Sequence, residues 1–312
     1  MPTFSFSEAF GAGFALVFRR PLTVAAWGGV MLLAIGVPGL LLFAWVGPQV
    51  AALMHYMAQQ AQTGAQPDPA EILRLEGSIM TVQPLMLLVS VVCRAVLAAA
   101  VLRAVLEPQN SRFAYLRLGM QEVWVGLLTL AMGVMLGIAM VCTMLGVAVV
   151  AGIIGLAMMA SHAPQGVTAL AALAAGLIAV GVLVWGVVRL SLALPMTFAE
   201  REFRLFESWE LTRGHGFKLF TLALALLGVV LAVGLVFNLV AVGVGMLAGG
   251  SLTLARMQAL LQRPPQAWIG QLAPWLALVA LVGSFLGAAF STVMIAPWAV
   301  VYRQLRPAAG AV

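Results

Sequence analysis

Charged residues are scarce in this chain of 312 residues, because Asp, Glu, Lys and Arg together make up 8% of it. A soluble globular domain usually contains about 25% charged residues. Hydrophobic residues make up 63% of the chain, and its mean hydropathy is +1.08. The composition excludes a soluble globule. Apolar runs of about 20 residues or more predict an all-α, polytopic membrane protein.

Cysteine is also scarce. Cys93 and Cys142 both lie within apolar runs, where a thiol acts as a small apolar side chain. Two cysteines are too few for a disulfide framework. The net charge of +6 comes from arginines at the ends of apolar runs and not from a basic tract. We therefore expect no nucleic-acid partner.

Side chains that could perform chemistry are few and dispersed. Asp68 is the only aspartate, and the histidines are isolated from one another. Metal binding and nucleophilic catalysis need such groups close together. The glutamates of residues 200–210 alternate with arginines, which favours ion pairing over paired catalytic carboxylates. We therefore expect no catalytic residue, no metal site and no cofactor. The three histidines are His55, His162 and His215.

The apolar runs predict one transmembrane domain over residues 1–312, built from six spans that form three helical hairpins. The apolar run that begins at 123 reaches 159, which is too long for a straight crossing and predicts a tilted helix or an irregular end. The predicted spans are about 22–46, 84–106, 123–150, 167–197, 217–246 and 274–302. The predicted interfacial amphipathic helices are about 5–20, 69–80, 111–121, 200–213 and 252–262.

Two of the interfacial helices have recognisable starts. Residues 1–20 lack the basic leading region and cleavage site of a signal peptide. Phenylalanine recurs at every fourth position from Phe6 to Phe18, behind a Ser5 to Glu8 capping box. Asp68 precedes a proline at the first position of the helix predicted over 69–80.

Arg94 and Arg189 interrupt apolar runs. A guanidinium exposed to lipid hydrocarbon is costly. We therefore expect both arginines to face inward as structural residues, in contact with helix-terminal carbonyls or with carboxylates such as Glu107 and Glu202. Contact with a substrate or a lipid headgroup is the alternative.

The segment after Arg189 contains several signals in a short space. Pro195 predicts a kink as the helix leaves the membrane. Residues 200–213 place Trp209 and Thr212 on an apolar face opposite the charged residues. Gly214, which follows Arg213, supplies the left-handed residue that ends a helix.

The stretch SWELTRGHGFKLFTLALALL at 208–227, with the apolar span and proline before it, resembles the bacterial glycerophosphoryl diester phosphodiesterase membrane-domain family and related six-helix inner-membrane proteins of unknown function. The resemblance covers the middle of the chain. In the enzymes of that family catalysis belongs to a separate soluble metal-dependent barrel, for which this chain has no room. The resemblance therefore implies a bacterial inner-membrane protein. We expect no hydrolytic activity on glycerophosphodiesters, because hydrolysis needs a metal or a positioned acid and base, and the polar side chains here are dispersed.

The distribution of basic residues predicts that both termini are cytoplasmic. At the expected outer side lie Arg74, Arg256 and Arg263. At the expected cytoplasmic ends lie Arg19, Arg20, Arg103, Arg112, Arg117, Arg201, Arg204, Arg213, Lys218, Arg303 and Arg306.

An internal repeat is a further hypothesis. A surface helix followed by two spans begins three times, near Phe4, Ser111 and Glu200. Arg94 precedes Glu107 by thirteen residues, and Arg189 precedes Glu202 by the same spacing. Such repeats suggest three hairpins around a pseudosymmetric axis.

Three classes of function remain open. The favoured class is a non-catalytic scaffold or accessory protein that engages membrane lipid or a protein partner at the cytoplasmic face. The second is a transporter of a small solute or lipid, which needs polar groups in mid-membrane. The third is an intramembrane or membrane-associated hydrolase. The candidate structural or headgroup-contacting residues are Arg94, Arg189, Glu107, Glu202, Trp209, Thr212, Arg213 and Gly214.

Overall fold

The structure is a computed structural model that describes residues 4–64, 68–81, 83–109, 111–160, 165–247 and 265–306. Within these ranges the regular elements are helices and there is no strand. Six helices are long and apolar enough to cross a membrane, so the predicted all-α polytopic membrane protein is confirmed. In order, the helices are α1 (Phe6–Arg19), α2 (Pro21–Met31), the π-helix η1 (Leu32–Gly36), α3 (Val37–Thr63), α4 (Pro69–Met80), α5 (Gln83–Leu106), the short turn η2 (Arg112–Tyr115), α6 (Met120–Ala160), α7 (Gln165–Leu190), α8 (Ala193–Glu200), α9 (Glu207–Leu211), α10 (Gly216–Leu247) and α12 (Pro265–Leu305).

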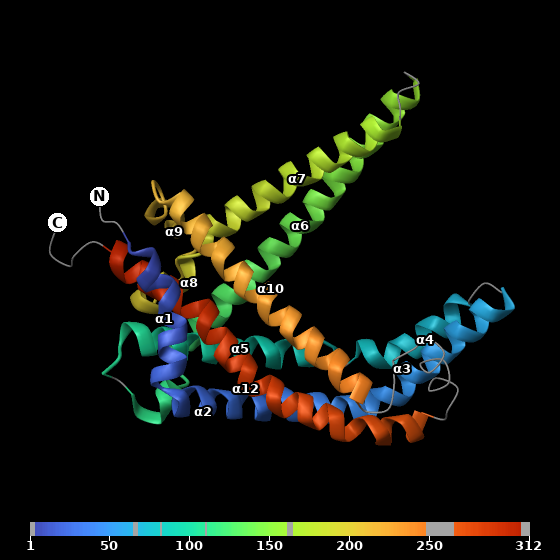
Figure 1. The fold of residues 1–312 in the computed structure, drawn as a ribbon, viewed down its shortest axis with the longest axis horizontal. Helices are drawn as coiled ribbons and strands as arrows, with labels where there is room; N and C mark the ends of the chain where they lie inside the picture. The colour runs from blue at the N-terminus through green and yellow to red at the C-terminus, as the bar shows by residue number, and fades with distance from the viewer. Residues whose placement is uncertain are drawn as a thin grey trace.

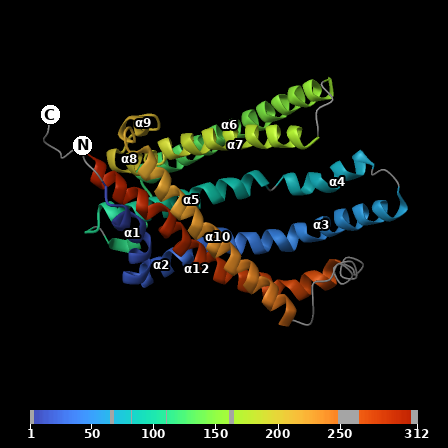
Figure 2. The ribbon, with the colours of Figure 1, turned by 45° about the horizontal axis from the view of Figure 1, so that its top comes forward.

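The helices form an open wedge (Figure 1). One arm is the α6–α7 hairpin, and the other, here called the α12 arm, consists of α2, α3, α5 and α12 (Figures 1 and 2). The arms meet at a narrow end, which also holds α1, α8, α9 and both ends of the described chain. The chain exposes 18968 Å², whereas a compact soluble protein of this mass exposes roughly 12,400 Å².

Helix α12 is the centre of its arm, because α1, α2, α3 and α5 all pack against it. Two glycines allow this close packing. A Cβ atom on Gly13 would overlap the backbone of Val293, and one on Gly28 would lie 2.9 Å from the Cα atom of Phe285. Small residues such as Ala296 and Ala299, both fully buried, complete the contact face of α12.

The first span is irregular where the sequence places Pro38. Proline has no N–H group to donate to the carbonyl four residues earlier, here that of Ala34. The helix widens at this point into the π-helix η1. Such bulges are a common way for a helix to absorb a missing hydrogen bond.

Helix α6 contains 41 residues, which at 1.5 Å per residue is about 60 Å and twice the thickness of a bilayer core. The long apolar run that starts at 123 is therefore one continuous helix. A helix of this length must tilt or extend beyond the hydrocarbon.

Residues 111–121 do not form the predicted amphipathic helix. Phe113, Ala114 and Tyr115 adopt positive φ angles of 52°, 54° and 65°. The indole of Trp27 donates a hydrogen bond to the Ala114 carbonyl at 2.7 Å. This left-handed turn depends on a partner far away in the sequence. The local apolar periodicity therefore predicted a helix where the structure has a turn.

Residues 200–213 are not one helix either. Helix α8 ends at Glu200 because Arg201 is left-handed, with a φ of 60°, and α9 covers only Glu207–Leu211. The N–H of Arg204 donates to the hydroxyl of Thr197 at 3.1 Å, a bond that replaces the helical ladder.

The predicted capping box at the start of α1 is also wrong, since the Ser5 side chain makes no capping hydrogen bond. Glu8 instead accepts hydrogen bonds from Gln304 at 2.7 Å and from Arg303 at 3.2 Å. The start of α4 is as predicted, with the Ala70 N–H donating to the Asp68 carboxylate at 2.9 Å. The helix predicted over 252–262 lies outside the described residues.

Candidate functional site

The candidate site lies at the end of α7, where the chain turns into α8. Pro195 cannot donate to the Ser191 carbonyl and its ring clashes with it, so the helix breaks between α7 and α8. The Ser208 hydroxyl donates to the Arg189 carbonyl at 2.7 Å and satisfies a carbonyl that has lost its partner at a helix end. The Thr212 hydroxyl donates to the Trp209 carbonyl at 3.1 Å and lies 3.4 Å from the Arg189 carbonyl. Both hydroxyl side chains are fully buried.

The Arg189 side chain lies against two tryptophans. Its Cζ atom is 5.5 Å from the ring centre of Trp185 and 5.6 Å from that of Trp209. The two indoles pack edge to face, with their centres 4.8 Å apart. Each ring face attracts the guanidinium electrostatically. Trp185 is 52% exposed and Trp209 39% exposed, so the cluster lies at the protein surface.

The guanidinium of Arg189 is not fully satisfied. Its Nε and Nη1 atoms are shielded from solvent and have no hydrogen-bond partner among the described residues. A shielded N–H group without an acceptor is unfavourable, more so when it is charged. An anionic oxygen at this position would remove the cost, and the planar guanidinium fork matches a phosphate or carboxylate. Arg189, Trp185 and Trp209 are therefore a candidate anion site.

Glu202, the carboxylate suggested as a partner of Arg189, contacts a different arginine. Glu202 is 67% exposed and accepts from Arg204 Nη2 at 3.0 Å. The predicted pair of Glu200 and Arg204 is present, with Oε2 and Nε 2.7 Å apart. The hydrogen bond to Glu202, followed by the charge of Glu200, raises the pKa of Arg204.

Arg94 does not face inward, so this expectation is also wrong. Its neighbours Cys93 and Ala95 are each 4% exposed, whereas Arg94 is exposed. Glu107 follows the same helix thirteen residues later, and that spacing separates two residues by about 20 Å. The N–H of Glu107 instead donates to the Arg103 carbonyl at 2.8 Å. Arg94 and Arg189 therefore lie in different surroundings, although the repeat hypothesis aligns them.

The structure thus gathers part of the predicted set around Arg189. Trp209 packs on its guanidinium, and the Thr212 hydroxyl lies 3.4 Å from its carbonyl. Gly214 is left-handed as predicted, with a φ of 85°. Arg213 is exposed at the surface. Two residues that lie around Arg189, Trp185 and Ser208, were not predicted from the sequence. Trp185 lies four residues before Arg189, on the same face of a helix, which is a signal that the sequence contains.

A buried ion pair at the narrow end was also not predicted from the sequence. Arg103 and Glu122 contact each other and are 2% and 5% exposed. Arg103 Nη1 donates to the Tyr115 carbonyl at 2.6 Å, and its Cζ atom lies 5.4 Å from the ring centre of Phe198. The cluster joins α5, η2, α6 and α8. An arginine near a span end ordinarily marks topology, so the sequence contains no sign of this burial.

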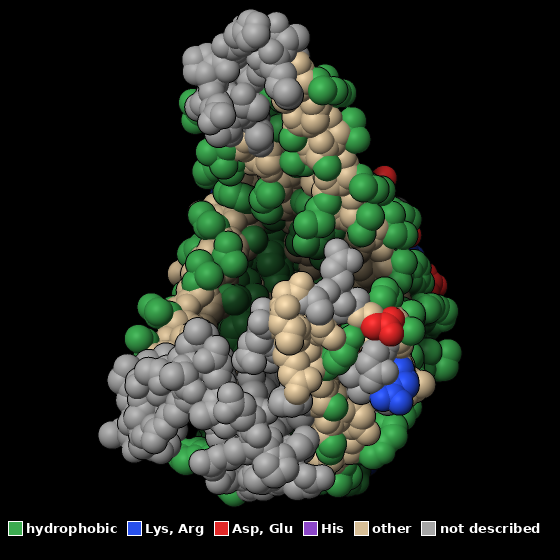
Figure 3. Space-filling model, turned by 90° about the vertical axis from the view of Figure 1, so that its right-hand side faces the viewer, with side chains coloured by type: hydrophobic (Ala, Val, Ile, Leu, Met, Phe, Trp, Pro, Cys, Tyr) green, Lys and Arg blue, Asp and Glu red, His purple; other side chains and the backbone are tan. Residues whose placement is uncertain are grey.

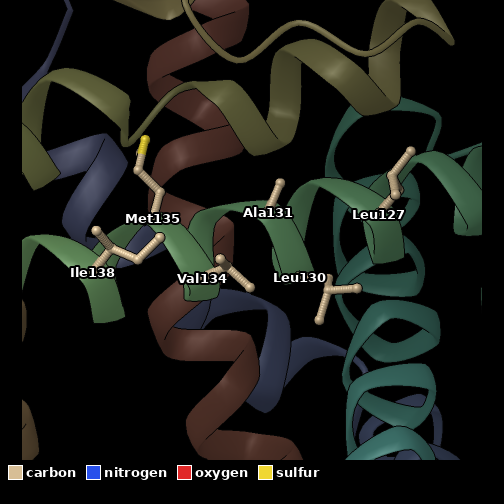
Figure 4. A pocket seen from close by; sticks show the side chains of 6 residues that line it. All are labelled: Leu127, Leu130, Ala131, Val134, Met135 and Ile138. Carbon is tan, nitrogen blue, oxygen red and sulfur yellow. The ribbon is translucent and has the colours of Figure 1, made fainter.

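The remaining surfaces are apolar. One face of α6 lines a shallow pocket of about 450 Å³, and every lining residue comes from that one helix (Figure 4). Figure 3 shows a hollow between the two arms with hydrophobic side chains inside it. Within the described ranges, no group of three or more His, Cys, Asp or Glu could hold a metal ion. The pocket-lining residues are Leu127, Leu130, Ala131, Val134, Met135 and Ile138.

The comparisons with known proteins found no match among family models, curated proteins or solved structures. The class of the protein follows from its own helices. It is an integral, multi-pass membrane protein, because six described helices are long and apolar enough to cross a bilayer.

Proposed function

We propose that this protein is a non-catalytic scaffold or accessory protein of the bacterial inner membrane, and that it binds membrane lipid with the lipid phosphate at Arg189. The observation that carries the proposal is the guanidinium between Trp185 and Trp209, with two shielded nitrogens that have no acceptor within the described part of the chain. The resemblance of residues 208–227 to a bacterial inner-membrane family supports the location. That resemblance concerns a membrane part without a catalytic domain.

A lipid phosphate fits the position of Arg189. The residue lies near one end of the candidate span Leu173–Glu200, the level at which headgroups meet hydrocarbon. Tryptophans favour this level because the indole has an apolar body and an N–H donor. Acyl chains would pack on the apolar side chains of the α6–α7 arm, many of which are exposed.

The test compares Arg189→Gln with Arg213→Gln, because Arg213 is an exposed arginine at the same end that lies outside the cluster. Lipid that remains bound to the purified full-length protein is measured by native mass spectrometry. We expect Arg189→Gln to lose bound phospholipid and Arg213→Gln to retain it. Arg189→Lys should recover only part of the binding, since lysine lacks the planar fork. Equal retention by all variants would refute the proposal.

The non-catalytic character has its own test. Purified protein supplied with divalent metal should not hydrolyse glycerophosphodiesters, because hydrolysis needs a metal or a positioned acid and base. Turnover that is lost on changing His215 or Glu207 would instead make the protein an enzyme.

A transporter is the second candidate, and the hollow between the arms favours it (Figure 3). A polar solute would need mid-membrane polar groups that are free to bind it. Ser284 and Thr292 instead donate to carbonyls of their own helix, at 2.6 Å and 2.8 Å. Lipid is therefore the better cargo. Movement of fluorescent lipid between leaflets of reconstituted vesicles would distinguish a transporter from a scaffold.

A further inference from the structure

A second apolar surface lies on the α12 arm, away from Arg189. It is a groove of about 690 Å³ between the first span and α5. Val30 and Ala34 line one side, Leu88 and Val92 belong to the opposite side, and the loop from Phe113 to Leu118 closes one end. Among the described residues of the lining, Arg117 is the only charged one, and it belongs to that end loop.

The loop at the end of the groove is held in place by buried contacts. Three consecutive left-handed residues, 113–115, cost of order 1–3 kcal/mol each and persist only where the surroundings fix them. Here the Trp27 indole holds the Ala114 carbonyl at 2.7 Å, and Arg103 holds the Tyr115 carbonyl at 2.6 Å. The Tyr115 hydroxyl donates to the Pro108 carbonyl at 3.0 Å. The loop that carries Arg117 is therefore a fixed part of the groove.

The charges around this end are mostly positive. The loop at 108–119 contains Arg112 and Arg117 and no acidic residue, and both arginines are exposed. Arg20 lies close by, with its Cζ atom 5.4 Å from the ring centre of Tyr115. Two acidic residues flank the loop: Glu107 comes directly before it and is half-buried, and Glu122 comes after it and is buried against Arg103. The groove therefore has an apolar body and a cationic end.

We propose that this groove binds one acyl chain of an anionic phospholipid whose phosphate lies at Arg117. The apolar body excludes a polar ligand, because buried polar groups need hydrogen-bond partners and the lining offers few. The groove opens on two helices that cross the membrane, so acyl chains reach it directly. Basic side chains at the membrane surface attract anionic lipid over zwitterionic lipid. The site rests on residues other than those around Arg189 and is independent of them.

The test uses the full chain in detergent with two defined probes, dioleoyl phosphatidylglycerol and dioleoyl phosphatidylcholine. Val92→Trp fills the groove, and Leu87→Trp is its control, since Leu87 is 63% exposed on the same helix and does not line the groove. Arg117→Gln removes the cation without touching the apolar body. Native mass spectrometry counts the lipids bound to each variant.

We expect the unchanged protein to bind phosphatidylglycerol in preference to phosphatidylcholine. Arg117→Gln should weaken phosphatidylglycerol binding roughly fivefold, the effect of one basic residue near a membrane surface. Val92→Trp should lose the bound lipid and Leu87→Trp should keep it. Arg189→Gln should leave this binding unchanged, so the two lipid sites can fail separately.

Several results would overturn the proposal. Retention of phosphatidylglycerol by Val92→Trp would show that the groove is not the site. Equal binding of both lipids, unaffected by Arg117→Gln, would show that the groove does not select an anionic headgroup. A change of oligomeric state in Val92→Trp without loss of lipid would assign the groove to a second copy of the chain. Unfolding temperatures without added lipid should be equal for the two tryptophan variants. A lower unfolding temperature for Val92→Trp alone would mean that this variant loses lipid because it misfolds.

Discussion

At the scale of single residues, the buried pair of Arg103 and Glu122 is the strongest electrostatic feature of the narrow end. Arg103 is 2% exposed and also holds the Tyr115 carbonyl. Removing one member of a buried pair leaves an uncompensated charge, which usually costs more than removing both members. The two positions are therefore coupled.

We predict that Glu122→Leu destabilises the protein by about 3–5 kcal/mol. The double variant Arg103→Leu with Glu122→Leu should be more stable than Glu122→Leu alone, because no charge is then left buried. Arg112→Leu is the control, since Arg112 is exposed. Chemical unfolding in detergent measures the difference. Additive effects of the two substitutions would contradict the proposed coupling.

The aromatic cluster around Arg189 is a residue-scale feature with a different origin. Trp185 and Arg189 are four residues apart on α7, so the helix itself brings them together. Trp209 comes from a later helix, α9, where the Ser208 hydroxyl donates to the Arg189 carbonyl at 2.7 Å. This bond joins the start of α9 to the end of α7, beside which the second indole packs.

At the scale of elements, α2 provides a matched pair of adjacent glycines that tests its packing against α12. Gly28 faces Phe285, and a Cβ atom there would lie 2.5 Å from the Phe285 ring. The adjacent Gly29 has nothing within 4 Å of such an atom. Gly133 and Gly283 also have open space. Close helix packing therefore depends on particular glycines.

We predict that Gly28→Ala destabilises the protein by about 1–3 kcal/mol, since overpacking forces the two helices apart. Gly29→Ala should have no destabilising effect. The two substitutions change helix propensity equally, and only Gly28→Ala adds a clash. Unfolding temperature in detergent, measured for both variants, is the readout. Equal behaviour of the two variants would show that α2 and α12 are not packed at Gly28.

At the scale of the whole molecule, the basic residues gather where the arms meet. The narrow end holds α1, α8, α9 and both ends of the described chain (Figure 1). Residues 303 and 304 of α12 bond to Glu8 of α1, so the two ends of the chain lie on the same side. Arg74 belongs to α4, which lies at the opposite end (Figure 1).

We predict that this narrow end is cytoplasmic, because basic residues are retained on that side of the membrane. Reporter fusions after Gly64 and after Val312 give the orientation. The fusion at Gly64 should report the outer side, and the fusion at Val312 the cytoplasm. A periplasmic signal from the fusion at Val312 would refute the predicted topology.

The sequence by itself determined the class of the protein and much of its helical structure. Six long apolar runs require helices, because in lipid the backbone must form its own hydrogen bonds. The bounds of α5 and α10 follow the predicted spans to within a residue or two. Local signals were also sufficient at Asp68, whose carboxylate accepts from the first turn of α4, and at Gly214, which is left-handed in the turn between α9 and α10.

Only the tertiary structure decided which polar groups meet. Arg103 and Glu122 are nineteen residues apart, and the Trp27 indole bonds to a carbonyl eighty-seven residues away. Such contacts override local periodicity, which is why residues 111–121 form a left-handed turn instead of a helix. The surroundings of Arg94 and Arg189 were decided in the same way. Similar apolar neighbours in the sequence leave one guanidinium exposed and the other between two tryptophans, because burial depends on which helices pack together.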